Sequence, residues 1–272
     1  MNPLSSIFHS PSSIRKRIGV FDSGAGGLTV VKALLEHRLF DEIIYYGDTA
    51  RVPYGTKDPN TIVRYGLEAL EFFNNFDVDL LIAACNTVSA HALPQMRAKS
   101  AYPVYGVIEP GILALRRALP DRDARILIIA TRATIASGRY QQELDALGYR
   151  RVSAMQTGML VPIVEEGIRS GAVMEAMLDH YFASLEEVPD AVILGCTHFP
   201  LVAEAIGAYF GGRPLMIHSG EAMVEYLKEQ GVREGAGQSD LKIFASDNVE
   251  GLRRIAGEWL GDAEGKSPRM SG

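Results

Sequence analysis

The sequence has few cysteines and no long apolar stretch, and each shortage excludes a class of protein. Its 272 residues contain two cysteines, too few for a small secreted fold held together by disulfides. No apolar run approaches the roughly 20 residues that a membrane-spanning helix needs. Positive charge is also scarce, with a net charge of −6, which argues against nucleic acid or an anionic membrane as the main partner. We expect a cytoplasmic protein with free thiols, built from one large or two medium-sized domains.

The two ends of the chain lack the pattern of packed elements. Residues 1–16 are rich in Ser and Pro and lead into the basic cluster of residues 15–17. A secretory signal has the reverse order, with its charge before an apolar stretch. We predict disordered tails at residues 1–16 and 262–272.

Between these ends, short apolar segments rich in Val, Ile and Tyr alternate with longer helical patterns. Strands separated by single helices form right-handed βαβ units, so the pattern predicts an α/β fold with mostly parallel sheets flanked by helices. The predicted strands are residues 17–21, 42–46, 79–84, 103–107, 125–130, 151–156, 190–195, 213–217 and 241–245. The predicted helices are residues 28–37, 61–76, 135–147, 173–185, 221–229 and 249–260.

A weak internal repeat indicates two halves of similar structure. Residues 79–85 match residues 190–196, and each segment begins with aspartate and ends with cysteine. Residues 17–23 and 125–131 form a second similar pair at nearly the same offset. One such match between apolar strands is common by coincidence, but two at nearly one offset favour a duplicated fold.

Duplicated halves have consequences for the architecture and for the site. We predict two pseudo-symmetric domains, the first made of residues 17–107 and 222–261 and the second of residues 108–221. Ligands of such sheets bind beyond the carboxyl ends of the strands. The loops that carry Cys85 and Cys196 would therefore meet at one cleft between the domains.

Each cysteine follows an apolar strand and precedes residues with hydroxyl or amide groups. Cys85 is followed by Asn-Thr and Cys196 by Thr-His-Phe-Pro. A thiol at a helix N-terminus has a lowered pKa, because free backbone amides and the helix dipole stabilise the thiolate. A single such cysteine is more often a small buried hydrophobe, but a matched pair favours chemistry. A metal site that includes His198 and His91 is one alternative, although ligands are scarce, and a disulfide, disfavoured in the cytoplasm, is another.

Two opposed thiols suit the inversion of a stereocentre. One thiolate removes a proton from the central carbon, and the opposite thiol returns a proton to the other face. The two protonation states are exchanged in each turnover. The enzyme is then ready for the reverse reaction.

Several loops that follow strands carry groups able to bind a small anion. The glycine-rich loop of residues 22–27 can present backbone amides to a carboxylate, or it is a tight turn in which Asp22 caps a helix. The loop of residues 47–56 is long for its type and typical of a ligand loop, with a solvated turn as the alternative. Thr131 and Thr134 can donate to a carboxylate or cap a helix.

Two titratable residues complete the candidates. His198 can hold or relay the proton of Cys196, because its pKa range suits the task. Glu165, taken by itself, is interpreted as a surface acid at the end of a helix.

Together these motifs resemble those of the glutamate racemases. The matching segments keep the family's order and cover the chain from about residue 17 to residue 260. They are residues 21–24, 26–30, 47–50, 53–55, 84–87, 109–111 and 194–201. Aspartate racemases also carry two cysteine loops, but the Pro-Tyr-Gly segment and the Thr-His-Phe-Pro run after Cys196 point to glutamate. The family usually has glycine where this chain has Ala130.

The resemblance implies a pseudo-symmetric fold of two domains with the active site in the cleft between them. It also implies a catalyst without pyridoxal phosphate and without a metal. Cys85 would deprotonate the D-isomer of glutamate and Cys196 the L-isomer. Asp22 and His198 would assist them.

The resemblance further implies how glutamate is bound. Tyr54 and the backbone amide of Gly55 would bind the side-chain carboxylate. Asp48 and Glu165 would adjust the properties of the site without contacting the substrate. The residues implied to hold the amino-acid head are Asp22, Ser23, Asn86, Thr87, Thr131, Thr134 and Thr197.

The implied product, D-glutamate, would serve peptidoglycan synthesis and cell-wall biogenesis. Glutamate is the expected partner, with no nucleic acid and no membrane, and a homodimer is possible. A non-catalytic amino-acid-binding protein is one competing hypothesis, although it would normally have lost a cysteine or a helper residue. A pyridoxal-phosphate racemase is another, and it would bind that cofactor through a lysine.

Overall fold

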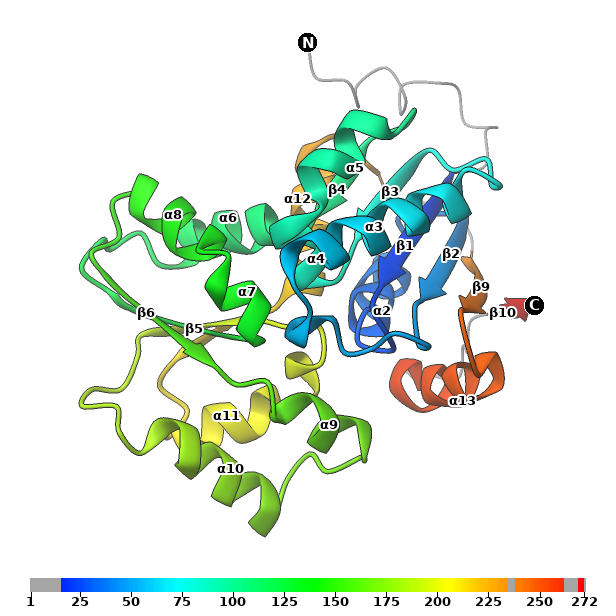
Figure 1. Cartoon of the computed structure of the whole chain (residues 1–272). Helices are drawn as coiled ribbons and strands as arrows, with labels where there is room; N and C mark the ends of the chain where they lie inside the picture. Colours follow the sequence, from blue (N-terminus) through cyan, green and yellow to red (C-terminus); the bar gives the residue numbers. More distant parts are fainter. Residues whose placement is uncertain (1–15, 234–237, 262–268, 272) are drawn as a thin grey trace.

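The computed structural model describes residues 16–233, 238–261 and 269–271 (Figure 1). The tails predicted at residues 1–16 and 262–272 lie outside these ranges, apart from Lys16 and the last segment. That segment forms a short strand, β10 (Arg269–Ser271), which differs from the predicted tail. It pairs in parallel with β9 (Asp240–Ala245).

The first sheet has the strand order β10-β9-β2-β1-β3-β4, and the strand pairs described in it are parallel. The second sheet has the order β6-β5-β7-β8, also with parallel pairs. The order β2-β1-β3-β4 therefore recurs as β6-β5-β7-β8, which confirms the predicted pseudo-symmetric α/β fold. The strands are β1 (Arg17–Asp22), β2 (Glu42–Gly47), β3 (Leu80–Ala83), β4 (Val104–Gly106), β5 (Arg125–Ala130), β6 (Arg151–Gln156), β7 (Ala191–Gly195) and β8 (Leu215–Ile217).

The symmetry extends to single hydrogen bonds at the amino ends of the strands. The backbone amide of Arg17, which begins β1, donates to Asp79 Oδ2 over 2.8 Å. The amide of Arg125, which begins β5, donates to Asp190 Oδ2 over the same 2.8 Å. The two pairs of segments that are similar in sequence are thus also bonded in the same way.

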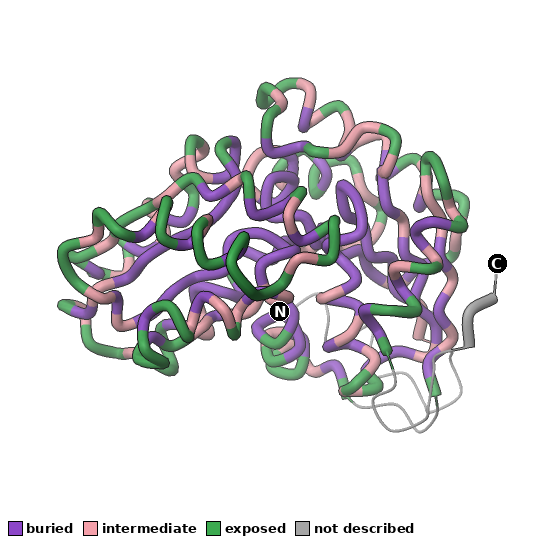
Figure 2. The backbone as a smooth tube through the Cα atoms, turned by 90° about the horizontal axis from the view of Figure 1, so that it is seen from below, coloured by how far each residue is buried: buried purple, intermediate pink, exposed green. Residues whose placement is uncertain are grey.

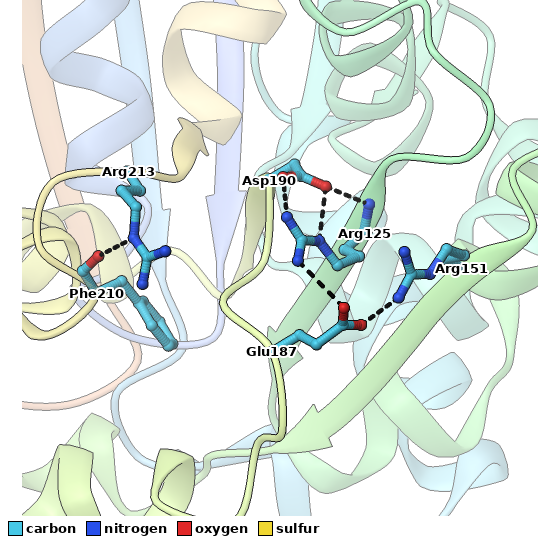
Figure 3. Close-up of polar contacts among 6 residues, drawn as sticks. All are labelled: Arg125, Arg151, Glu187, Asp190, Phe210 and Arg213. Carbon is cyan, nitrogen blue, oxygen red and sulfur yellow. Dashed lines mark hydrogen bonds and ion pairs between the residues drawn. The ribbon is translucent and has the colours of Figure 1, made fainter.

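Figure 3 shows the polar cluster around the second of these pairs. Glu187 pairs with Arg125, at 3.5 Å, and with Arg151. Arg125 and Arg151 begin β5 and β6, and Asp190 immediately precedes β7. The cluster therefore ties the amino ends of three strands together, at the edge of the sheet opposite the cysteine loops.

The first sheet lies between two apolar layers, because alternate side chains of each strand point to opposite faces. In β2, Ile43 and Tyr45 belong to the core beneath α2, α12 and α13, and Ile44 belongs to the core beneath α3, α4 and α5. These helices are α2 (Leu28–Glu36), α3 (Pro59–Phe73), α4 (Asn86–His91), α5 (Leu93–Lys99), α12 (Ser219–Glu229) and α13 (Val249–Leu260).

The second sheet is covered in the same way. In β5, Ile126 and Ile128 face α6 and α8, and Leu127 and Ile129 face α9, α10 and α11. Figure 1 shows α6 and α8 on one side of this sheet with α10 and α11 on the other, and Figure 2 shows buried chain running through both halves. These helices are α6 (Ile108–Ala118), α8 (Arg139–Ala146), α9 (Leu160–Glu165), α10 (Ala172–Phe182) and α11 (Ala203–Tyr209).

The sequence-based elements need two corrections. The single helix predicted at 135–147 is two helices, α7 (Arg132–Ala136) and α8, because Gly138 adopts a left-handed conformation with φ 70° and turns the chain between them. Helices α5, α6 and α9 were not predicted, because segments of one to three turns carry a weak periodic pattern, whereas the helix expected after Cys85 is present as α4. The predicted strands are all present, with small shifts at their ends.

The helices also join the halves. α12 packs against α2 of the first half and against α6, and the domain boundary predicted at residue 222 falls inside it. Within the described ranges, no helix combines the length and apolar character that crossing a membrane requires.

Candidate active site

Cys85 and Cys196 occupy equivalent positions, just beyond the carboxyl ends of β3 and β7. Both are buried, with 6% and 7% of their surface exposed, and both are free thiols, so the disulfide alternative does not apply to this structure. Cys85 is the N-cap residue of α4. Cys196 is instead followed by a turn and a short 3-10 helix, η2 (Phe199–Val202), so the helix expected directly after it begins later.

The pKa of Cys85 differs from the sequence prediction. Burial raises it to about 12, the charge of Asp22 adds to the increase, and the hydrogen bonds with Ser23 and with the Val88 amide oppose it without cancelling it. The prediction of a lowered pKa is therefore wrong here, because the cost of burying a thiolate exceeds what the helix N-terminus returns. Cys85 is a thiol at neutral pH, and its Sγ donates to Ser23 Oγ over 3.5 Å.

Cys196 belongs to a chain of three titratable groups. Its Sγ lies 3.8 Å from His198 Nδ1, and His198 Nε2 lies 3.0 Å from Glu165 Oε1. Burial alone would lower the pKa of His198, but the hydrogen bonds to Cys196 and Glu165 outweigh burial and raise it to about 10. The hydrogen bonds to Cys196 and to Glu165, at the end of α9, therefore act together to favour the protonated form of the buried imidazole.

Asp22 connects the first half to the loop of Cys196. It is fully buried, and its carboxylate accepts from the Gly24 amide (3.0 Å) and from the Thr197 hydroxyl (3.2 Å). Burial raises its pKa, while the charge of His198 and these hydrogen bonds oppose the rise. Helix α2 has Gly27 as its N-cap, and the amide of Gly27 is among the groups that hydrogen-bond to Asp22, so Asp22 also binds the backbone at the start of α2.

The glycine-rich loop allows the two halves to approach closely at this point. A Cβ atom on Gly26 would lie 2.3 Å from Thr197 Oγ1 and 2.6 Å from His198 Nδ1. The hydroxyl of Thr29 adds a hydrogen bond to the carbonyl of Thr197 over 2.9 Å. Only glycine fits at position 26 without displacing the residues that follow Cys196.

Three buried threonines meet across the halves beside Cys85. The hydroxyl of Thr87, in α4, lies 3.1 Å from that of Thr131 and 3.0 Å from that of Thr134, which are themselves 3.1 Å apart. Thr131 precedes α7, but its side chain does not cap that helix. The structure thus brings together the hydroxyls that the sequence offered for a carboxylate.

Asp48 organises the loop of residues 47–56. It is fully buried and accepts hydrogen bonds from Arg51 Nε (2.6 Å) and from the hydroxyl of Tyr54. Burial, and then Asp48, raise the pKa of Tyr54, which keeps its hydroxyl protonated. Gly55 lies against Thr131, since a Cβ on Gly55 would be 2.4 Å from Thr131 Cβ. The loop therefore contacts the threonine cluster directly.

Sequence reasoning missed Tyr140, whose hydroxyl donates to Asn86 Oδ1 over 2.6 Å. Residues 131, 134, 137 and 140 are Thr, Thr, Ser and Tyr at a spacing of three, which places hydroxyl side chains on one side of a helical segment. The turn at Gly138 separates Tyr140 from the other three residues, however, so this spacing does not predict its contact with Asn86. In the part of the chain that the structure describes, no group of three or more His, Cys, Asp or Glu side chains is arranged to hold a metal ion.

Comparison with known proteins identifies the family to which a chain with this fold and these two thiols belongs. The sequence signature described as Asp/Glu/Hydantoin racemase matches residues 29–227. The chain belongs to this family of racemases and is an isomerase.

Individual relatives narrow the class to the glutamate racemases. A glutamate racemase from a Nitratiruptor species is 60% identical over 248 residues, covering 91% of this chain and 97% of the relative. The crystal structure of the Campylobacter jejuni glutamate racemase is 52% identical, with a TM-score of 0.88 over 90% of this chain and 98% of that one. The Francisella tularensis glutamate racemase, crystallised with D-glutamate, is 32% identical, with a TM-score of 0.80 over 90% and 94% of the two chains.

Proposed function

We propose that this chain interconverts L- and D-glutamate with two thiols and without an added cofactor. The observation that carries the proposal is the equivalent placement of Cys85 and Cys196, one after β3 and one after β7, in halves with the same strand order. The charge of Cys196 is among those that act on Cys85, so the two sulfurs lie within electrostatic reach. A pair of buried thiols related in this way supplies one acid and one base.

The proposed proton transfers rest on the groups that lie beside each sulfur. Cys85 is a thiol, and protonated His198 is placed to stabilise a sulfur anion at Cys196. With L-glutamate, the Cys196 thiolate takes the α-proton, and the electron pair of the broken C–H bond remains on the α-carbon and its carboxylate. Cys85 then gives its proton to the opposite face. The D-isomer follows the reverse path, with Cys85 as the base and Asp22 as its neighbour.

We assign the amino-acid head of glutamate to the buried polar groups near Cys85 and Cys196. The hydroxyls of Thr87, Thr131 and Thr134 now bond to one another, and each can rotate to donate to an anion. Ser23 beside Cys85 and Thr197 beside Cys196 would complete the set, together with the residue discussed below.

We assign the side-chain carboxylate to the loop that Asp48 organises. The backbone amide of Gly55 is a donor next to Thr131, and Tyr54 lies beside it. Asp48 and Glu165 would act without touching the substrate, Asp48 through its hydrogen bond to Tyr54 and Glu165 through its hydrogen bond to His198. The D-glutamate produced would supply peptidoglycan synthesis in the cytoplasm.

Circular dichroism of glutamate solutions tests the proposal. Purified enzyme without pyridoxal phosphate should bring solutions of L-glutamate and of D-glutamate to the same zero signal, with aspartate as the control substrate. Glutamate binding without any change in signal would support a binding protein instead. Reduction with borohydride after adding pyridoxal phosphate tests the cofactor-dependent alternative, which alone predicts a labelled lysine.

A further inference from the structure

Tyr140 and Asn86 form a buried contact that the reaction scheme above does not use. Tyr140 is the second residue of α8, in the second half, and Asn86 is the first residue of α4, directly after Cys85. They are 1% and 2% exposed, and the hydroxyl of Tyr140 donates to Asn86 Oδ1 over 2.6 Å. The bond therefore fixes a residue of the Cys85 loop from the opposite half.

The hydrogen bond determines which group of the Asn86 side-chain amide remains without a hydrogen-bond partner. Burial, and then the charge of Cys196, raise the pKa of Tyr140, so its hydroxyl always carries a proton that needs an acceptor. The carbonyl oxygen of Asn86 provides that acceptor. Asn86 Nδ2, a donor, then has no hydrogen-bond partner among the described residues although it is buried. A buried donor without a partner is costly, unless a ligand accepts from it.

We propose that Tyr140 is a positioning residue that turns the Asn86 amide so that its NH₂ group donates to the carboxylate of the amino-acid substrate. The inference rests on the proposed function, because it takes that carboxylate as the acceptor. If the amide were rotated by 180°, its carbonyl oxygen would face the carboxylate and repel it. That rotation would also leave the O–H of Tyr140 without the oxygen to which it donates.

The position of Tyr140 fits this role better than a purely structural one. Its ring packs against Gly195, where an added Cβ would lie 3.3 Å from Tyr140 Cε2. Gly195 directly precedes Cys196, and Asn86 directly follows Cys85. One side chain therefore contacts the neighbours of both thiols.

Tyr149 offers a matched control for the hydroxyl. It is also buried, and its hydroxyl also donates over 2.6 Å, but to the carbonyl of Leu119 within the second half. Tyr140→Phe and Tyr149→Phe each remove one buried hydroxyl and keep the ring. We expect Tyr140→Phe to raise KM for both isomers of glutamate about tenfold, the effect of losing one oriented hydrogen bond, with a smaller change in kcat. Tyr149→Phe should leave KM within about twofold of the wild type.

A double-mutant cycle tests whether Tyr140 acts through Asn86. In an Asn86→Ala background, Tyr140→Phe should raise KM no further, because the amide that it orients is gone. Equal effects of Tyr140→Phe in both backgrounds would overturn the proposal, and so would an unchanged KM in the single variant. A wild-type enzyme that does not racemise glutamate would instead refute the proposed function, whatever the variants do.

A measurement on enzyme that keeps Tyr140 tests the proposal if Tyr140→Phe does not fold. Enzyme labelled with ¹⁵N-asparagine shows the side-chain NH₂ resonances, and Asn86→Ala identifies the pair that belongs to Asn86. D-glutamate should shift that pair downfield, as expected for a new hydrogen bond from the NH₂ group. No shift at saturating D-glutamate would mean that the amide does not face the substrate.

Discussion

The guanidinium of Arg125 binds both carboxylate oxygens of Asp190, through Nε at 2.9 Å and Nη2 at 2.7 Å. The equivalent pair of the first half, Arg17 and Asp79, keeps the backbone hydrogen bond, but the guanidinium turns to Glu42 instead. As a result, Arg125 lowers the pKa of Asp190 to about 2, whereas burial raises the pKa of Asp79. The two aspartates occupy matching positions in the sequence, but their pKa values shift in opposite directions in the folded protein.

This difference predicts unequal effects on stability when each aspartate is neutralised. The folded-state pKa of Asp190 is below the unfolded value, so its charge stabilises the fold above about pH 4 and that stability is lost as pH falls through about 2. The raised pKa of Asp79 means that its charge is disfavoured in the fold at neutral pH. Asp190→Asn should therefore lower the free energy of unfolding in urea at pH 7 more than Asp79→Asn does. An equal loss in both variants would show that only the shared backbone bond matters.

Much of the fold was predictable from sequence because the central strands β1, β3, β5 and β7 are buried on both faces. Parallel strands of this kind are continuous apolar runs, and the Asp-to-Cys echo between residues 79–85 and 190–196 revealed the repeat. The two cysteines stand at the ends of those runs, so the apolar pattern and the repeat were enough to identify them as candidates.

Other features depend on contacts that no local pattern carries. The pKa of Cys85 is set by burial among residues of both halves, and a sequence does not show how much solvent a loop loses. The bond from Tyr140 joins residues 54 positions apart, one in α8 and one in α4. Local patterns therefore located the chemistry, while the tertiary structure set its acidity and orientation.

The close approach at Gly26 predicts a sharp effect of one methyl group. In Gly26→Ala the new Cβ would collide with Thr197 and His198, so the loop of Cys196 must move, and a shift of about 1 Å can cost roughly a hundredfold in rate. Gly257→Ala, in the exposed face of α13 with nothing within 4 Å of the new Cβ, should instead stabilise the protein by about 0.5–1 kcal/mol. Racemase assays and thermal melts of both variants check this. Full activity in Gly26→Ala would mean that the loop tolerates the displacement.

The bond between Glu165 and His198 predicts a change in the pH profile. The folded-state pKa of His198, about 10, is above its ordinary value, so the stability it contributes is complete below about pH 6.5 and is lost as pH rises through about 10. Glu165→Gln removes one of the groups that raise this pKa. The basic limb of kcat/KM for the isomer that Cys196 deprotonates should move to lower pH.

Glu166→Gln is the matched control for that measurement, because Glu166 is the adjacent exposed acid. Its profile should overlay that of the wild type. If Glu165→Gln also overlays the wild type, the carboxylate does not set the protonation of His198 during turnover.

Treatment with a chelator tests whether racemisation depends on a metal ion. Both proposed proton carriers are sulfur atoms, so racemisation should survive dialysis against EDTA with less than about a twofold loss of kcat. The assay is repeated after adding zinc back. Activity that disappears on dialysis and returns with zinc would show that a metal, and not the thiol pair alone, performs the reaction.

Replacing the cysteines separates the two half-reactions. A serine hydroxyl is far too weak an acid to be a base at neutral pH, so Cys85→Ser and Cys196→Ser should each reduce racemisation at least about a thousandfold, or about 4 kcal/mol of lost barrier reduction. Each variant keeps one thiol, however, and that thiol can still remove the α-proton on its own side. A glutamate analogue with a leaving group on its β-carbon would then undergo elimination from one isomer. Cys85→Ser should act on the L-isomer and Cys196→Ser on the D-isomer, as measured by release of the leaving group. If both variants process the same isomer, the thiols do not stand on opposite faces of the substrate, and if either keeps full racemisation, that cysteine is a buried structural residue.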